Sequence, residues 1–373
     1  MIYFDNAATS FPKPKCVVDA TYRCIKKYCA NPGRSAHKLA IMTSERVYEA
    51  REKIANFIGI KAPEKILFTQ NATHALNLAI KTTVKPDTHV LISDLEHNAV
   101  LRPINRLKDT QNVEYSVFST LGSIEENIKS LIRENTKYIV TTLASNVIGR
   151  TVSLEELSAV AKKYGLILIV DASQLIGHKV IDIGKYPCNI LCAPGHKALF
   201  GIQGVGFAVI NDDIAREAFI YGGTGSDSLN LNMPSMLPER YEAGTLPSPA
   251  IVSVAAGIDY IESVGISAIE EKINVLTERC EYVVNEIKNV VTYESGNGII
   301  SFNVSGVPAQ VISEELAQHG ICTRCGLHCA PLVHQTIGTV GIGTVRISLS
   351  YLNKIREIDV LYKVLSALSK KYA

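Results

Sequence analysis

Residues 166–174 read Leu-Ile-Leu-Ile-Val-Asp-Ala-Ser-Gln, a short, continuously apolar run that ends in an acid. A run of this length without alternation is typical of a strand buried on both faces of a parallel sheet. This alternation of strands and helices continues elsewhere, with apolar runs at 66–69, 89–93 and 138–142 and helical patterns over 71–84 and 154–164. It predicts an α/β fold with a mainly parallel central sheet and helices on both faces. Ligands of such sheets bind beyond the carboxyl ends of the strands.

The second half of the chain has a different pattern. Residues 222–249 are rich in Gly, Ser, Asn and Pro, which indicates a long irregular segment with a functional or interfacial role. After it we expect helices over 251–264, 268–289, 309–319 and 354–371, and a strand over 299–304. This order predicts a second, smaller α+β domain.

The composition restricts the possible functions. Lys and Arg number 38 and Asp and Glu 36 among 373 residues, a net charge of +2 that excludes a strongly basic nucleic-acid binder. Nine cysteines, an odd number in a long chain, favour reduced thiols and a cytoplasmic location. We see no signal-peptide pattern at the start and no apolar run near about 18 residues, so we expect no membrane partner.

Asp171 and Gln174 follow the predicted strand at its ligand-facing end. An acid there can pair with a cationic heterocycle, and Gln174 can donate a hydrogen bond to a ring oxygen. The alternative is local, because Asp171 or Ser173 can also cap the next helix.

Lys197 belongs to a Gly195-His196-Lys197 turn that follows the apolar run 190–192. A poorly solvated lysine has a lowered pKa and is a candidate Schiff-base amine, and His196 can bind a phosphate. The alternative is an ordinary surface turn with a solvated lysine.

Residues 69–74 lie at a strand-to-helix junction, where free amides and the Thr73 hydroxyl can bind a phosphate. Simple capping by Asn71 or Thr73 is the alternative. No Walker lysine motif and no GxGxxG follow the first strand, so a nucleotide is not indicated. His97 and Asn146 follow the next strands and can reach the same crevice, with His97 either stacking on a planar cofactor or serving a structural role.

Taken in order, these segments resemble one family. They are Phe4-Asp5-Asn6-Ala7-Ala8-Thr9, Glu96-His97, Asn146, Asp171 with Gln174, Gly195-His196-Lys197, Arg240-Tyr241-Glu242-Ala243-Gly244-Thr245 and Gly326-Leu327-His328-Cys329. The chain resembles the NifS-like cysteine desulfurases and selenocysteine lyases, fold-type I pyridoxal 5'-phosphate (PLP) enzymes also called class V aminotransferases. The short loop before Cys329 is similar to the SUF-type branch. The resemblance implies a large domain over 12–250 and a small domain from 1–11 and 251–373.

The resemblance also implies roles toward PLP. Lys197 holds the cofactor covalently and later moves the α-proton, Asp171 keeps the pyridine nitrogen protonated, and Gln174 binds the phenolic oxygen. His97 stacks on the ring and acts as an acid–base group. The phosphate is held by the Ala72 amide, Thr73 and His196, and by Thr245 of the partner subunit in a homodimer with shared sites.

For the substrate, the resemblance assigns the carboxylate to Asn146 and Arg346, with Arg346 as a two-point clamp. Cys329 takes the substrate sulfur. Two departures from the family pattern, Pro194 three residues before Lys197 and Ala72 in place of a hydroxyl residue, predict weaker binding of PLP.

Residues 322–329 read Cys-Thr-Arg-Cys-Gly-Leu-His-Cys. These are zinc-ligand types, but four ligands within eight residues lack the usual spacer, and we expect no metal. A redox pair, Cys325 with Cys329 or Cys322 with Cys325, and a core role for Cys322 and Cys325 are the other readings. Arg324 and His328 are expected to lower the pKa of Cys329.

The implied reaction removes sulfur from L-cysteine, giving L-alanine and a persulfide on Cys329 that a sulfur-acceptor protein can take. The alternative on the same scaffold is a selenocysteine lyase acting on L-selenocysteine, with selenide as product and a selenium-acceptor protein as the partner. Transamination gives Cys329 no role, and a non-catalytic scaffold leaves Asp171 and Lys197 unexplained.

Overall fold

The computed structural model describes residues 1–33, 35–211, 217–226 and 228–373. Its largest sheet has seven strands in the order β2-β8-β7-β6-β5-β3-β4. The strands are β2 (Ile66–Thr69), β3 (His89–Ser93), β4 (Glu114–Phe118), β5 (Thr136–Thr142), β6 (Ile167–Asp171), β7 (Ile190–Pro194) and β8 (Gly206–Ile210). Only β8 runs antiparallel to its two neighbours, β2 and β7. The predicted α/β fold with a mainly parallel sheet is confirmed.

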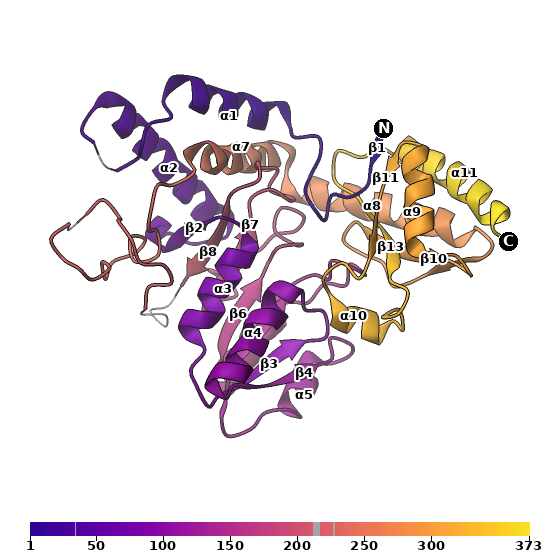
Figure 1. The fold of residues 1–373 in the computed structure, drawn as a ribbon, viewed down its shortest axis with the longest axis horizontal. Coiled ribbons are helices and arrows are strands. Elements are labelled where there is room, and N and C mark those ends of the chain that lie inside the picture. The colour runs from indigo at the N-terminus through magenta and orange to yellow at the C-terminus, as the bar shows by residue number, and fades with distance from the viewer. Residues whose placement is uncertain (34, 212–216, 227) are drawn as a thin grey trace.

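Helices cover both faces of this sheet (Figure 1). Because successive side chains of a strand point to opposite faces, Leu168 and Val170 of β6 join one buried cluster and Ile169 joins the other. On the Ile169 side lie α3 (Ala72–Thr83) and α4 (Asn98–Gln111). On the other side lie α2 (Lys38–Phe57), α5 (Ile124–Lys129), α6 (Leu154–Tyr164) and α7 (Ser248–Val264), with α1 (Lys15–Lys27) against α7 and η1 (Pro63–Lys65) before β2.

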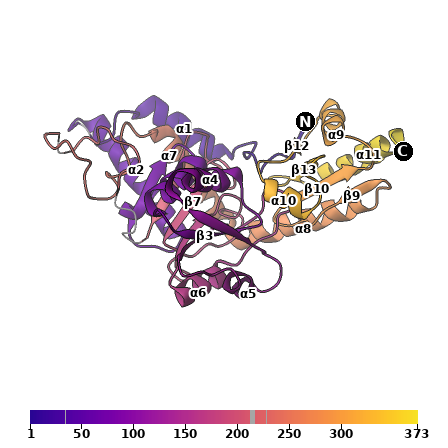
Figure 2. The ribbon, with the colours of Figure 1, turned by 60° about the horizontal axis from the view of Figure 1, so that its bottom comes forward.

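A second group of elements forms a lobe beside the sheet (Figures 1 and 2). Its four-stranded antiparallel sheet has the order β12-β13-β10-β9. The elements are β9 (Val290–Thr292), β10 (Ile299–Val304), β11 (Ile321–Cys322), β12 (Arg324–Gly326), β13 (Thr344–Ser348), α8 (Ile266–Asn285), α9 (Ala309–Gln318), α10 (Pro331–Thr336) and α11 (Ile355–Lys371). The N-terminal strand β1 (Ile2–Tyr3) pairs with β11 in this lobe, although about 320 positions separate them in the chain.

Two sequence boundaries differ from expectation. The helix expected over 268–289 ends at Asn285, because Asn289 takes a left-handed φ of 62° and the chain then enters β9. Helix α7 starts at Ser248, and its buried residues share a cluster with the large sheet. The domain boundary at 250/251 stays a prediction.

Within the described residues no single helix is long and apolar enough to cross a membrane; only the bent pair α7 and α8, at 82°, meets both criteria jointly.

Candidate functional site

The carboxyl ends of the parallel strands open into a cavity of about 220 Å³. Most residues singled out from the sequence line it: Ala72, Thr73, His97, Asn146, Asp171, Gln174, His196, Lys197 and Arg346. The structure therefore brings together side chains from β5, β6, the turn after β7, the starts of α3 and α4, and β13 of the second lobe. Thr245 and Cys329 are exposed and do not line this cavity.

Asp171 and Lys197 are charged residues that line the cavity. Asp171 is the last residue of β6 and is 3% exposed, and its Oδ1 accepts a hydrogen bond from the Ser173 amide at 2.9 Å. It thus closes a local turn and also lines the cavity, but it caps no helix, because all residues between β6 and β7 are described and none of them is helical. Burial lowers the pKa of Lys197 to about 8, and the nearby Asp171 carboxylate only partly opposes this. The Lys197 amine can lose its proton near neutral pH, as a nucleophilic lysine must.

The start of α3 provides an anion site at one end of the cavity. Asn71 caps the helix by accepting from the His74 amide at 2.9 Å, so the earlier first-turn amides of Ala72 and Thr73 have no acceptor within the helix. Gly206 of β8 makes this possible, because a Cβ there would lie 2.5 Å from the Asn71 carbonyl carbon. His196 Nδ1 is also buried without a hydrogen-bond partner. Ala72, Thr73 and His196 therefore bring unpaired polar groups to the lining of the cavity.

The N-terminal segment holds the turn that carries Lys197. The carbonyl oxygen of His196 accepts from the Ser10 amide (3.2 Å), Thr9 Oγ1 (3.1 Å), Ser10 Oγ (3.2 Å) and Lys13 Nζ (2.8 Å). Burial lowers the pKa of Lys13 to about 8. Thr9 belongs to the quoted motif without an assigned role, and Ser10 and Lys13 were not predicted, because nothing in their local pattern shows that they meet His196.

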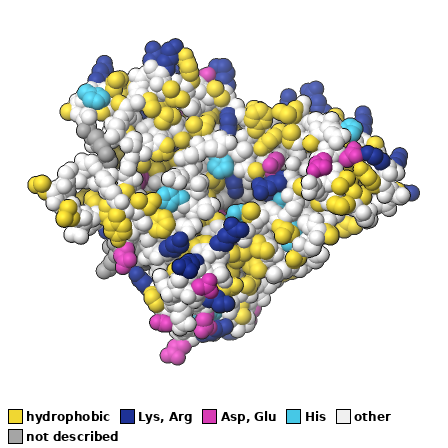
Figure 3. All heavy atoms as spheres, viewed as in Figure 1, with side chains coloured by type: hydrophobic (Ala, Val, Ile, Leu, Met, Phe, Trp, Pro, Cys, Tyr) yellow, Lys and Arg dark blue, Asp and Glu magenta, His cyan; other side chains and the backbone are white. Residues whose placement is uncertain are grey.

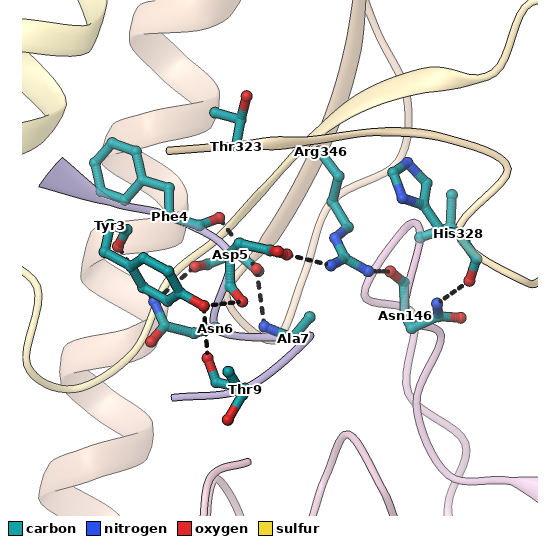
Figure 4. A network of polar contacts seen from close by, with 12 residues as sticks. Tyr3, Phe4, Asp5, Asn6, Ala7, Thr9, Asn146, Thr323, His328 and Arg346 are labelled. Atoms are coloured by element: carbon teal, nitrogen blue, oxygen red, sulfur yellow. Dashed lines mark hydrogen bonds and ion pairs between the residues drawn. The ribbon is translucent and has the colours of Figure 1, made fainter. Parts of the chain in front are cut away.

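Arg346 lies at the other side of the cavity and is 1% exposed (Figure 4). One terminal nitrogen donates to Asp5 Oδ1 at 2.7 Å and the other to the Asn146 carbonyl at 2.9 Å, while Nε has no partner. Asn146 Nδ2 in turn donates to the His328 carbonyl at 2.7 Å. A substrate carboxylate would meet a guanidinium already oriented by Asp5, a residue of the quoted motif to which the sequence assigned no role.

His97 caps α4 through Nδ1, which accepts from the Ala99 amide at 3.0 Å. Its proton is therefore on Nε2. Burial lowers the pKa of His97 to about 4, with Asp171 partly opposing the shift, so the ring is neutral at physiological pH. The preceding Glu96 is fully buried, and burial raises its pKa to about 8. The sequence showed this acid beside His97 but not its burial.

Cys329 follows the cavity-lining His328 on a constrained loop. His328 and Cys329 both have left-handed φ values, 48° and 59°, which non-glycine residues rarely adopt. The Asn98 amide donates to the Cys329 carbonyl at 2.7 Å and fixes the loop on the start of α4. His328 is buried, and burial holds its pKa far below the ordinary value. The His328 imidazole is therefore neutral and places no positive charge next to Cys329.

The other predicted residues stand apart from the cavity. Cys322 and Cys325 are partly buried, and all nine cysteines are free thiols. Across the described parts of the chain, no group of three or more His, Cys, Asp or Glu residues is arranged to hold a metal ion. Thr245 lies in the irregular segment before α7, so its predicted contact with a partner's phosphate stays a prediction.

Comparisons with known proteins identify the family. The aminotransferase class-V model matches residues 2–361. A probable cysteine desulfurase of Methanothermobacter thermautotrophicus is 31% identical, covering 99% of this chain and 94% of that protein. One of Pyrococcus abyssi is 32% identical with the same coverage. The apo structure of a cysteine desulfurase from Thermococcus onnurineus superposes with a TM-score of 0.90 at 32% identity, covering 99% of this chain and 95% of that one. The chain therefore belongs to the aminotransferase class-V family, among its NifS-like cysteine desulfurases.

Proposed function

We propose that this protein is a PLP-dependent cysteine desulfurase that converts L-cysteine to L-alanine and leaves the sulfur as a persulfide on Cys329. The observation that carries the proposal is the placement of Asp171, Lys197 and the start of α3 around one cavity, with the exposed Cys329 next in the chain to the lining residue His328. The names of the similar proteins also support it.

The cavity residues fit PLP. The unpartnered His196 Nδ1 and the free first-turn amides suit its phosphate, and the buried Asp171 carboxylate suits a protonated ring nitrogen. Close packing of Gly206 against Asn71 shapes the phosphate end, where Ala72 contributes an amide rather than a hydroxyl. PLP, when bound, supplies an electron sink that stabilises negative charge at the substrate α-carbon.

The chain's own residues then divide the work. Lys197 Nζ, with a pKa of about 8, bonds the cofactor and later takes the α-proton. His97 stays neutral with its proton on Nε2, so its ring can lie against the cofactor without repelling a cationic nitrogen. Arg346, held by Asp5, binds the substrate carboxylate through its remaining N–H groups.

The sulfur transfer uses Cys329. Its thiolate attacks the substrate sulfur, so a bond forms between Cys329 Sγ and that sulfur while the substrate carbon–sulfur bond breaks. The electron pair stays on carbon, whose protonation gives alanine. Cysteine and one enzyme thiol thus yield alanine and one enzyme persulfide, with no external oxidant.

The test is alanine release from L-cysteine and L-selenocysteine side by side, with added PLP and excess reductant. Alanine from L-cysteine, and a mass increase of one sulfur on Cys329, would support the proposal. Cys329→Ser should abolish the persulfide, whereas the matched Cys325→Ser variant should retain it. Turnover of L-selenocysteine alone would replace the proposal with selenocysteine lyase. A homodimer with Thr245 in the partner's site, an acceptor protein and a cytoplasmic location stay predictions.

A further inference from the structure

A second cavity, of about 290 Å³, adjoins the first and contains Cys329 in its wall. Two helix ridges line it, each with side chains four residues apart: Thr73, Asn77 and Lys81 on α3, and Asn98, Arg102 and Arg106 on α4. The two cavities share Thr73, His97 and Ala99. We call the first the inner cavity and the second the outer cavity.

The outer cavity carries unbalanced positive charge. Lys81, Arg102 and Arg106 are exposed, and none of them forms an ion pair with a described residue. No Asp or Glu is among the described residues that line this cavity. Figure 3 shows Lys and Arg side chains gathered in the middle of the face over α3 and α4. Arg102 and Arg106 are like charges one turn apart, an arrangement that destabilises a helix. Within the described residues these cations have no acidic partner, so an anion from solution can neutralise them.

The cysteine thiol belongs to the same compartment. Cys329 is exposed and lines the outer cavity but not the inner one. The hydrogen bond from the Asn98 amide to the Cys329 carbonyl, at 2.7 Å, fixes the loop on α4, one turn before Arg102. A molecule bound by the cations would thus lie beside the thiol.

We propose that the outer cavity binds the carboxylates of a low-molecular-weight thiol that accepts sulfur from Cys329. This rests on the proposed function, which supplies the persulfide. The volume is at the lower end of the range for small-molecule pockets, and three cations suit a thiol with two carboxylates.

The transfer is balanced within the two partners. The incoming thiolate attacks the outer sulfur of the Cys329 persulfide and forms a new sulfur–sulfur bond. The bond between that sulfur and Cys329 Sγ breaks, and its electron pair stays on Cys329. One thiolate enters as a persulfide acceptor and one leaves as the free Cys329 thiolate, so no oxidant or reductant is needed.

A first experiment tests the charge at Cys329 without any turnover. The PLP-loaded enzyme is alkylated with iodoacetate, an anion, and with neutral iodoacetamide, and the two rates at Cys329 are read by peptide mass spectrometry. The ratio of the rates cancels any change in thiolate fraction. We expect the ratio of the iodoacetate rate to the iodoacetamide rate to be at least about threefold higher at Cys329 than for a free neutral cysteine derivative. The double variant Arg102→Gln with Arg106→Gln should remove this excess. Arg356→Gln, an exposed arginine on α11, is the matched control. A ratio equal to that of the free thiol, or unchanged in the double variant, would overturn the proposal.

A second experiment tests the acceptor. Enzyme loaded with one persulfide and freed of cysteine is mixed with mercaptosuccinate (dianionic), thioglycerol (neutral) or cysteamine (cationic), and loss of the persulfide is followed by mass. We expect the dianionic thiol to be favoured over the others, after correction for intrinsic reactivity, and the preference to disappear in the double variant. Equal rates for all three thiols, or discharge only by a protein partner, would contradict the acceptor site while leaving the desulfurase proposal intact. If no persulfide forms at all, the proposed function fails first and the acceptor site with it.

Discussion

The inner and outer cavities differ in how they treat charge. In the inner cavity two charged groups have a partner or are withdrawn from water: Arg346 pairs with Asp5, and burial lowers the pKa of Lys197 to about 8, whereas Arg324 is partly buried. In the outer cavity Lys81, Arg102 and Arg106 are exposed and lack acidic partners among the described residues. Desolvation tunes a group for proton transfer, whereas solvated charge attracts a mobile ligand. The difference indicates that the reaction takes place in the inner cavity and that small molecules exchange at the outer cavity. Four predictions test it.

The largest effect is expected at Lys197. Lys197→Ala removes the amine whose proton affinity the inner cavity adjusts, so alanine formation should fall by at least about a thousandfold. The absorption of covalently held PLP should disappear as well. Lys162→Ala, an exposed lysine on α6, should leave both unchanged. Substantial turnover in the Lys197 variant would break the assignment of the inner cavity.

Glu96 tests the desolvation of the same region. Its folded pKa of about 8 lies above that of an unfolded glutamate, so the folded state binds more protons in between and stability falls as pH rises toward 8. Between pH 6 and pH 9 this group should cost about 2–3 kcal/mol, two pH units at about 1.36 kcal/mol each. Glu96→Gln should lose that much less stability than the native chain in urea unfolding at the two pH values. If the stabilities of the variant and the native chain change equally between the two pH values, Glu96 is not desolvated.

Gly206 tests the phosphate end. In Gly206→Ala the new Cβ would lie 2.5 Å from the Asn71 carbonyl carbon and 2.9 Å from the Ala72 nitrogen, so the start of α3 must move. We expect the dissociation constant of PLP to rise about tenfold, roughly 1.4 kcal/mol. Gly341→Ala, where an added Cβ meets nothing within 4 Å, is the control. Equal cofactor affinity in both variants would place the phosphate elsewhere.

The smallest effect is expected in the outer cavity and has the opposite sign. Arg106→Gln relieves the repulsion between Arg106 and Arg102 on α4 and should stabilise the protein by a few tenths of a kcal/mol. Arg106→Lys keeps the charge and should not. The measurement is the urea midpoint of unfolding of the two variants and the native chain under identical conditions. A loss of stability in Arg106→Gln would mean that Arg106 has an acidic partner, contrary to the unpaired charge described for the outer cavity.

The sequence predicted what depends on local pattern. The apolar run before Asp171 and the turn before Lys197 identify strand ends, and parallel strand ends meet at one edge of a sheet. The direction of β8 was not predictable, because an apolar run is equally compatible with a parallel and an antiparallel strand. The pairing of Asp5 with Arg346 and of Lys13 with His196 was also beyond reach, since each joins residues far apart in the chain. The neutrality of His328 depends on burial that only the packed second lobe creates.

The pairing of the first strand with β11, and of Asp5 with Arg346, has a consequence for biosynthesis. Asp5 leaves the ribosome 341 positions before Arg346, a delay on the order of tens of seconds at normal translation speed. During that time the nascent chain can form the central sheet but lacks both Cys329 and Arg346. Under the proposed function, incomplete chains would therefore form no persulfide.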